Sequence, residues 1–387
     1  LAVAQKNYID KDCHFSVQDE NGMVLIGFLA FLDPPKPSAA SAIRQLKEHG
    51  IEVKILSGDN DAVVQTIARQ VGIDTTNALT GPALSAMSEE SRRNAVVHTT
   101  VFSKLTPLQK TEIIQLLQEQ QHTVGFLGDG INDASALRQS DIGISVDSAV
   151  DIAKESADII LLEKDLMVLE DGVLEGRKTF GNITKYIKMT ASSNFGNMFS
   201  VMAASAFLPF LPMLPIHLLI QNLLYDVSQT TIPFDRMDAE YLRKPRKWDA
   251  SDLSRFMLFI GPISSVFDII TYLVMWYAFG CQSPEHQALF QSGWFIEGLL
   301  SQTLIVHMIR TRKIPFIQSR ASWQVTGLTG LIMVIGILLP FTSFGSSIGL
   351  QPLPLSYFPW LIAILFAYCL LTQTVKNWYI RRFVKWL

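Results

Sequence analysis

The second half of this sequence consists of long apolar segments, each of about 20 residues or a little more and therefore able to cross a lipid bilayer as a helix. They occupy residues 183–207, 216–234, 253–279, 290–309, 322–342 and 356–375. Hydrophobic residues make up 49% of the 387-residue chain, which is high for a soluble protein. We therefore expect an all-α transmembrane bundle of six helices in a lipid bilayer.

Lysine and arginine residues lie in alternate connections of these segments. The charged connections and the tail contain Arg236, Arg243, Lys244, Arg246, Lys247, Arg310, Arg312, Lys313, Arg320, Lys376, Arg381, Arg382 and Lys385. The connections at 208–215, 280–289 and 343–355 contain neither residue type. Because positive charge stays on the cytoplasmic side of a membrane, the region before the first segment and the C-terminus should both be cytoplasmic.

The first half alternates short apolar runs with helical runs, which is typical of βαβ units and a parallel, doubly wound α/β sheet. Helices are predicted at 39–49 and 62–71, and strands at 51–56, 101–104, 124–127, 142–146 and 159–162. An earlier run, 23–32, predicts a buried strand, and the proline-rich sequence at 33–37 then marks a boundary. From Leu166 a proline-free helix is expected to continue into the first apolar segment.

One loop of the α/β region combines glycines with acidic side chains. Gly128-Asp129-Gly130, followed by Asn132 and Asp133, stands between a predicted strand and a helix. At the carboxyl end of a parallel strand the glycines let the backbone approach a phosphate, and Asp129 and Asp133 offer oxygen ligands to Mg²⁺. A lone Gly-Asp-Gly is also a common turn without any ligand.

Two further stretches have side chains suited to phosphate. Ser57-Gly58-Asp59 lies between a strand and a helix N-terminus, where a hydroxyl and backbone N–H groups can hold a phosphoryl oxygen, although the same residues can serve as a plain helix cap. Lys110 lies in the first turn of a helix that Pro107 begins. A lysine there opposes the helix dipole, so a nearby anion would help to explain it; the alternative is a solvated surface lysine.

The string GDGINDASAL resembles the hinge signature of P-type ion-pumping ATPases, which are haloacid-dehalogenase-like phosphotransferases, and the other two loops follow in the family's order. The family usually has TGD where this chain has Ser57-Gly58-Asp59. The resemblance implies a phosphorylation domain at 33–176, preceded by the end of a nucleotide-binding domain at 1–32 and followed by a transmembrane domain at 177–387 that matches spans five to ten.

Site roles follow from the same resemblance. It implies that ATP is the phosphoryl donor, that Ser57, Asp59 and Lys110 bind the cofactor, and that Asp129 and Asp133 bind the catalytic Mg²⁺. The implied catalytic residues are Ser57, Gly58, Asp59, Lys110, Asp129, Asn132 and Asp133. The family's nucleophile is an aspartate in a DKTGT-type sequence, and this chain contains none. We therefore expect a C-terminal fragment that is inactive without the N-terminal part of the same pump.

Polar residues inside the apolar segments are placed with helical spacing. Asn194 and Asn197 share the first segment and Asn222 and Asp226 the second, so each pair can point the same way, and Glu297 lies on the fourth. A carboxylate at membrane depth is costly, which makes Asp226 a functional candidate, whereas asparagines can also simply join helices. We expect Asn197, Asn222 and Asp226, with Asn194 and Glu297 as further candidates, to bind the transported ion.

The stretches NFGNMFS and LPIHLLIQNLLYDVSQTTIPFDRMD resemble the bacterial magnesium-transporting P-type ATPases. Calcium pumps have glutamate where this chain has Asn197 and threonine where it has Tyr225. Mg²⁺ is commonly held by few carboxylates with retained water, so the loss of one charged ligand favours Mg²⁺ over Ca²⁺. The resemblance implies a multi-pass pump of the bacterial inner membrane that brings Mg²⁺ into the cytosol.

Other readings remain open at the level of sequence. A pump for another divalent cation such as Ca²⁺, a lipid-transporting pump, and a non-catalytic channel or sensor with a vestigial α/β domain are the alternatives. The net charge of −3 favours no nucleic-acid partner. The cysteines, Cys13, Cys281 and Cys369, lie far apart and are expected to be reduced thiols.

Overall fold

The computed structural model of the protein describes residues 1–7, 16–29, 34–383 and 386. These residues form two compact units, which are described separately below. The first comprises Leu1–Lys47 and Ile51–Glu170, and the second Glu48–Gly50 and Asp171–Leu387. Cys13 and the first residue of the proline-rich sequence at 33–37 lie outside the described residues, whereas Cys281 and Cys369 are free thiols.

Two three-stranded parallel sheets form the centre of the first unit, which confirms the predicted βαβ pattern. One sheet has the order β3 (Ile55–Leu56), β5 (Val101–Ser103), β4 (Leu79–Thr80), and the other the order β6 (Gly125–Leu127), β7 (Ile142–Val146), β8 (Ile159–Leu161). The helices are α1 (Ala39–Glu48), α2 (Asp61–Gln70), α3 (Gly81–Ser85), α4 (Glu89–His98), α5 (Pro107–Glu119), α6 (Ala134–Gln139) and α7 (Asp151–Ser156), with the 3₁₀ turn η2 (Ile131–Asp133) before α6.

Local sequence explains where the helix next to the candidate site begins. Thr106 caps α5 by accepting a hydrogen bond from the N–H of Gln109, and the Gln109 side chain accepts one from the N–H of Thr106 in return. Pro107 occupies the first helical position, where a missing N–H costs nothing. Lys110 is thereby fixed in the first turn, as predicted.

Two strand predictions were wrong in extent or burial. The run 51–56 forms only the two-residue strand β3. The run 23–32 contains β2 (Val24–Phe28), which pairs antiparallel with β1 (Ala2–Gln5); Val24 and Phe28 are exposed, and residues 30–32 lie outside the described part. β2 is exposed because this two-stranded ribbon, with the 3₁₀ turn η1 (Val17–Asp19), has no further layer packed on it among the described residues.

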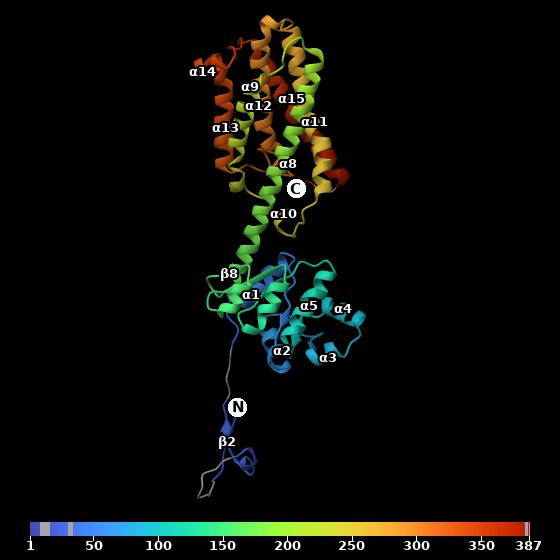
Figure 1. The fold of residues 1–387 in the computed structure, drawn as a ribbon, viewed down its shortest axis with the longest axis vertical. Helices are drawn as coiled ribbons and strands as arrows, with labels where there is room; N and C mark the ends of the chain where they lie inside the picture. The colour runs from blue at the N-terminus through green and yellow to red at the C-terminus, as the bar shows by residue number, and fades with distance from the viewer. Residues whose placement is uncertain (8–15, 30–33, 384–385, 387) are drawn as a thin grey trace. The chain divides into compact units, whose positions relative to one another are not determined.

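The second unit is a bundle of long helices (Figure 1). Its elements are α8 (Leu166–Phe207), α9 (Pro215–Gln229), η3 (Ile232–Phe234), α10 (Ala239–Leu242), α11 (Ala250–Tyr277), η4 (Pro284–His286), α12 (Gln287–Ile309), α13 (Trp323–Leu338), η5 (Leu339–Phe341), α14 (Ser343–Ser347) and α15 (Tyr357–Phe383). Helix α12 packs against α9, α11, α13 and α15 and is buried along almost its whole length, so it forms the centre of the bundle. The predicted proline-free helix from Leu166 is confirmed as α8.

Three helices of the described part are long and apolar enough to cross a membrane, namely Ala250–Tyr277, Trp323–Phe341 and Tyr357–Phe383. Three of the six expected spans therefore have the length and apolar composition of a membrane-crossing helix within the described part of the chain. Helix α9 ends at Gln229, before the predicted end at 234, and Pro233 falls in η3. Helix α12 contains polar residues such as Gln291 and Glu297, which are buried against neighbouring helices and do not face outward.

The packing of β7 gives a prediction for the first unit. A Cβ added at Gly143 would lie 2.6 Å from the carbonyl oxygen of Leu137, whereas one added at Gly125 on β6 would come no closer than 3.8 Å to Ile142. We expect Gly143→Ala to destabilise the protein by about 1–3 kcal/mol, because a backbone atom must move. Thermal unfolding measures the effect, with Gly125→Ala as the matched control; equal melting temperatures for the two variants would contradict this packing.

Candidate functional site

The loop after β6 folds back on itself through its aspartate. The Oδ2 of Asp133 accepts a hydrogen bond from the N–H of Gly130, and the carbonyl of Gly128 accepts one from the Ser145 hydroxyl. A Cβ at Gly128 would lie only 2.6 Å from the Cβ of Asp133. Glycine at this position therefore permits the close approach that presents both Asp129 and Asp133 at the carboxyl end of β6.

Lys110 and Asp133 form an ion pair with a distance of 2.7 Å between Nζ and Oδ1, and their side chains are only 12% and 13% exposed. The carboxylate of Asp133 is the nearby anion that we expected from the position of Lys110 near the N-terminus of α5. The alternative of a solvated surface lysine was wrong. The structure thus brings two of the predicted site residues together across the sequence.

Asp129 has a partner that the sequence did not reveal. The Nζ of Lys164 lies 2.6 Å from Oδ2 of Asp129, and both side chains are about half exposed. Lys164 follows β8, and Lys36 donates a hydrogen bond to its carbonyl. No local pattern marks a pairing between residues 35 positions apart.

A cavity of about 340 Å³ opens beside this pair, and Lys36, Asp129, Lys164 and Asp165 line it. The N–H of Met167 and the hydroxyl of Ser38 donate to Asp165 and hold the pKa of that carboxyl below its usual value. The cavity wall therefore carries two cations and two carboxylates.

The Ser57 loop lies at the end of β3. Its hydroxyl donates to Oδ2 of Asp59 at 2.9 Å and accepts from the N–H of Asp59 at 3.1 Å. The cap of α2 is Asn60, so the reading of Ser57 as a plain helix cap was wrong. Among the described residues no hydrogen bond joins Ser57, Gly58 or the exposed Asn132 to Lys110 or Asp129.

The strands that carry these two loops have free edges. β3 and β6 are the end strands of their sheets, so each is paired on one side only within the described part of the chain. Leu56 of β3 nevertheless packs against the cluster of buried side chains that contains Phe126 of β6. The Ser57 loop and the loop at Gly128–Asp133 therefore follow two neighbouring strands that do not pair with each other.

The acidic loop fits Mg²⁺ only as part of a larger ligand set. No group of three or more acidic, histidine or cysteine side chains in the described residues could hold a metal. Mg²⁺, however, is commonly bound by one or two carboxylates together with substrate phosphate and water. Oδ1 of Asp129 makes no hydrogen bond to the described residues, so the carboxylate has a free oxygen for such a set.

The predicted membrane candidates occupy helices α8, α9 and α12. Asn194, Asn222 and Asp226 are exposed and make no side-chain hydrogen bond to the described residues. Asn197 is half-buried, and its Oδ1 accepts a hydrogen bond from Gln302 at 2.8 Å. The exposed side chains thus lie on surfaces of α8 and α9 that no described residue covers.

Glu297 is fully buried in α12, and neither of its carboxyl oxygens has a hydrogen-bond partner among the described residues. Asp268 of α11 is an acidic neighbour of Glu297. Asp268 is buried too and accepts from the hydroxyl of Ser200 at 2.5 Å and from the indole N–H of Trp294 at 2.7 Å. The sequence analysis missed Asp268, although a carboxylate inside an apolar segment was the signal that could have found it.

Each of the two units contains a match to a known protein family. Residues 6–141 match the family described as haloacid dehalogenase-like hydrolase, and residues 210–378 match that described as cation transporting ATPase, C-terminus. In this order the two matches correspond to the C-terminal part of the cation-transporting P-type ATPases.

Within that family the chain is similar to the magnesium-transporting ATPases, P-type 1. It is 64% identical to one from Salmonella typhimurium over 371 residues (96% of this chain and 41% of the relative), and 58% identical to that of Escherichia coli over 383 residues (99% and 43%). An endoplasmic reticulum calcium ATPase of Aspergillus fumigatus is 31% identical over 280 residues (69% and 29%). The chain spans about two fifths of the length of its magnesium-transporting relatives.

The pairing of Lys164 with Asp129 gives a prediction about metal binding. Removing the lysine charge in Lys164→Gln should strengthen divalent-cation binding at Asp129, by up to about fivefold, because an exposed ion pair is worth at most about 1 kcal/mol. Mn²⁺ binding followed by electron paramagnetic resonance measures this without any activity. Lys154→Gln, which changes a lysine that pairs with Asp151, is the matched control; equal Mn²⁺ affinity in the two variants would show that Lys164 does not compete.

Proposed function

We propose that this chain is the C-terminal part of an ATP-driven pump that carries Mg²⁺ across the bacterial inner membrane through an aspartyl-phosphate intermediate. The observation that carries the proposal is the pair of phosphate-suited loops at the free edges of β3 and β6. A parallel strand inserted between these edges would place its carboxyl end between Ser57 and Asp129. We assign the phosphorylated aspartate to such a strand, in the part of the pump's length that this chain does not span.

Each loop then has a role in phosphoryl transfer. The ammonium of Lys110, held by Asp133, neutralises charge on the transferred group, and the hydroxyl of Ser57 donates to one of its oxygens. Asp129 and Asp133 would hold Mg²⁺, which when bound supplies charge neutralisation between the nucleophile and the phosphoryl oxygens. The N–H of Asp59 donates to the Ser57 hydroxyl oxygen and orients it, so the hydroxyl proton can turn from the Asp59 carboxylate to the phosphoryl oxygen. Gly58 forms part of that turn, and we assign the exposed Asn132 to contact with the phosphoryl group.

For the second unit we propose six membrane spans, formed by α8, α9, α11, α12, α13 and α15. The alternation of lysine and arginine among their connections supports cytoplasmic placement of the phosphorylation domain and the C-terminus. We retain the division into residues 1–32 of a nucleotide-binding domain, a phosphorylation domain at 33–176 and a transmembrane domain at 177–387. The similarity to the magnesium-transporting relatives supports the inner membrane as the location.

The transported ion is assigned to the uncovered faces of α8 and α9. Exposing Asp226 to lipid would cost several kcal/mol, so we infer that further helices of the complete pump cover this face and enclose the ion. Asn197, Asn222 and Asp226 then provide oxygen ligands, with Asn194 beside them. Glu297 and Asp268, buried in the adjacent helices without any cationic partner among the described residues, extend the acidic region behind it.

Mg²⁺ is favoured over Ca²⁺ as cargo. The identity to magnesium-transporting relatives is 58–64%, against 31% for the calcium ATPase. An uncharged Asn197 also leaves fewer direct anionic ligands, which suits an ion that keeps part of its water.

The phosphoryl-transfer role is tested at Asp129. In the complete pump Asp129→Asn should lower phosphoenzyme formation by at least about a hundredfold, because the transferred group loses its metal. Acid-stable incorporation of ³²P from γ-labelled ATP measures this. Asp151→Asn, which changes a 93% exposed aspartate of the same unit, should behave as wild type. Normal phosphoenzyme in Asp129→Asn would mean that the loop is only structural.

The ion site is tested at Asp226 and Asn222. Asp226→Asn removes a full charge and should abolish Mg²⁺-stimulated ATP hydrolysis, whereas Asn222→Ala should weaken apparent Mg²⁺ affinity by roughly tenfold through the loss of one ligand. Phosphorylation from inorganic phosphate should survive in both variants because the other unit is unchanged. Wild-type Mg²⁺ dependence in Asp226→Asn would move the ion path away from α9.

A further inference from the structure

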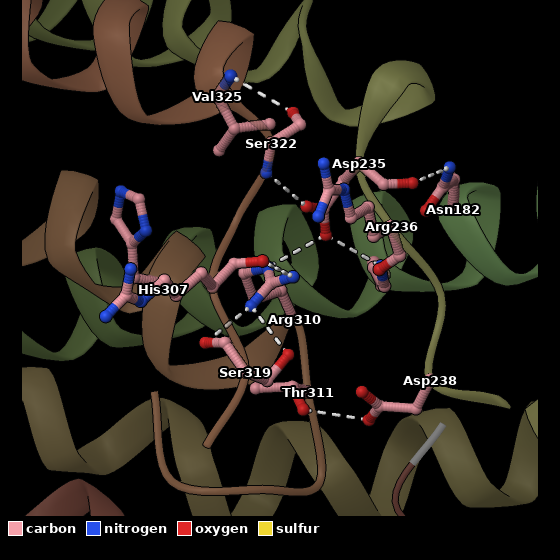
Figure 2. Close-up of polar contacts among 12 residues, drawn as sticks. Asn182, Asp235, Arg236, Asp238, His307, Arg310, Thr311, Ser319, Ser322 and Val325 are labelled. Atoms are coloured by element: carbon pink, nitrogen blue, oxygen red, sulfur yellow. Dashed lines mark hydrogen bonds and ion pairs between the residues drawn. The ribbon is translucent and has the colours of Figure 1, made fainter. Parts of the chain in front are cut away.

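One buried carboxylate connects the middle of α8 with the segments that follow α9 and α12. Asp235, just after η3, accepts on Oδ2 from Lys185 of α8 at 2.8 Å and from Arg310 at the end of α12 at 2.9 Å. Its Oδ1 accepts from the N–H of Ser322, the residue that caps α13 (Figure 2). The three charged side chains are 1–3% exposed.

The segment around Asp235 is attached to α8 by four hydrogen bonds. The side-chain amide of Asn182 donates to the carbonyls of Pro233 and Asp235, and Lys185 donates to the Asp235 carboxylate and the carbonyl of Arg236. Figure 2 shows Asn182 and Asp235 facing each other. Lys185 precedes Asn194 by about two and a half turns of α8. Asp235 follows Asp226 closely in sequence, so these bonds join the two helices of the proposed ion site.

The charges in this cluster are unequal, because two buried cations share one buried anion. Burial alone would raise the pKa of Asp235, but the charges of Lys185 and Arg310 outweigh it and hold that pKa below its usual value. Removing either cation still leaves Asp235 paired with the other. The contact of Asp235 with Lys185 and its contact with Arg310 can therefore be tested one at a time by mutation.

We propose, on the basis of the proposed function, that Lys185 is a positioning residue that makes the end of α9 move with α8. Displacement of α8 during the transport cycle is thereby passed to Asp226. Helix α8 is continuous from Leu166 and carries Asn194 and Asn197, while α9 carries Asn222 and Asp226. Without the attachment at Asp235, the candidate ion ligands on α8 could shift independently of those on α9. Arg310, by contrast, ties Asp235 to the connection after α12, through Ser319 and Arg320.

The test compares Lys185→Met with Arg310→Met in the full-length pump reconstituted in liposomes. Each variant removes one cation of the same cluster, and Lys185→Met leaves the carbonyl of Arg236 without that donor while Arg310→Met does so for Ser319 and Arg320, so similar melting temperatures are expected. In Lys185→Met the Mg²⁺ transported per ATP hydrolysed should fall about threefold or more while ATP hydrolysis continues. Adding Asn182→Ala should deepen that loss, and Arg310→Met should keep the wild-type ratio.

The outcomes separate this inference from the proposed function. An unchanged transport ratio in Lys185→Met, or an equal loss in Arg310→Met, overturns the assignment of Lys185 alone. A wild-type protein without Mg²⁺-dependent ATP hydrolysis would overturn the proposed function, and the inference with it.

Discussion

The pairing of buried charges is the constraint on which the helical unit depends. Besides the cluster at Asp235, Lys188 of α8 donates to the carboxylate of Asp252 in α11 and to the carbonyl of Trp386. Lys376 of α15 is fully buried and donates to the carbonyls of Met308, Thr311 and Lys313, at and beyond the end of α12. A cation is favourable at a helix C-terminus, and removing one partner of a buried pair is costly. These contacts therefore fix α8, α11, α12 and α15 to one another.

The buried carboxylates of the helical unit fall into two sets, those that pair with a cation and those that do not. Asp235 and Asp252 have lysine or arginine partners, whereas Asp268 accepts from the neutral donors Ser200 and Trp294, and neither Asp268 nor Glu297 pairs with a cation among the described residues. Carboxylates deep in a membrane protein are stable only with a partner or beside a wet cavity. In the proposed function, acids without a resident cation are the ones available to a passing cation, and Asp268 and Glu297 lie on α11 and α12.

Local patterns in the sequence predicted the elements well where periodicity and capping determine them. α5 begins at Pro107, β7 spans 142–146 as predicted, and the conflict between Lys110 and the helix dipole pointed to the anion that Asp133 provides. Pairings between distant residues were not predictable in this way. Lys164 with Asp129, and Lys185 and Arg310 with Asp235, are separated by 35 to 75 positions, and no repeat or spacing marks them. Burial of β2 was wrongly predicted because apolar composition does not say whether another layer covers a strand.

Charge balance at the proposed phosphoryl site would link phosphate binding to metal binding. Asp129 and Asp133 carry two negative charges, and Lys164 and Lys110 neutralise them in the described structure. A phosphoryl group brings further negative charge. If it bound without a cation, its charge would lie next to the two carboxylates of the loop and repel them. Entry together with Mg²⁺ would keep the sum near zero, with Lys164, the more exposed of the two lysines, free to leave Asp129. Lys110 is held in a partly buried pair, and in the proposed function it stays to meet the phosphoryl oxygens, so the two lysines would serve the same loop in different ways.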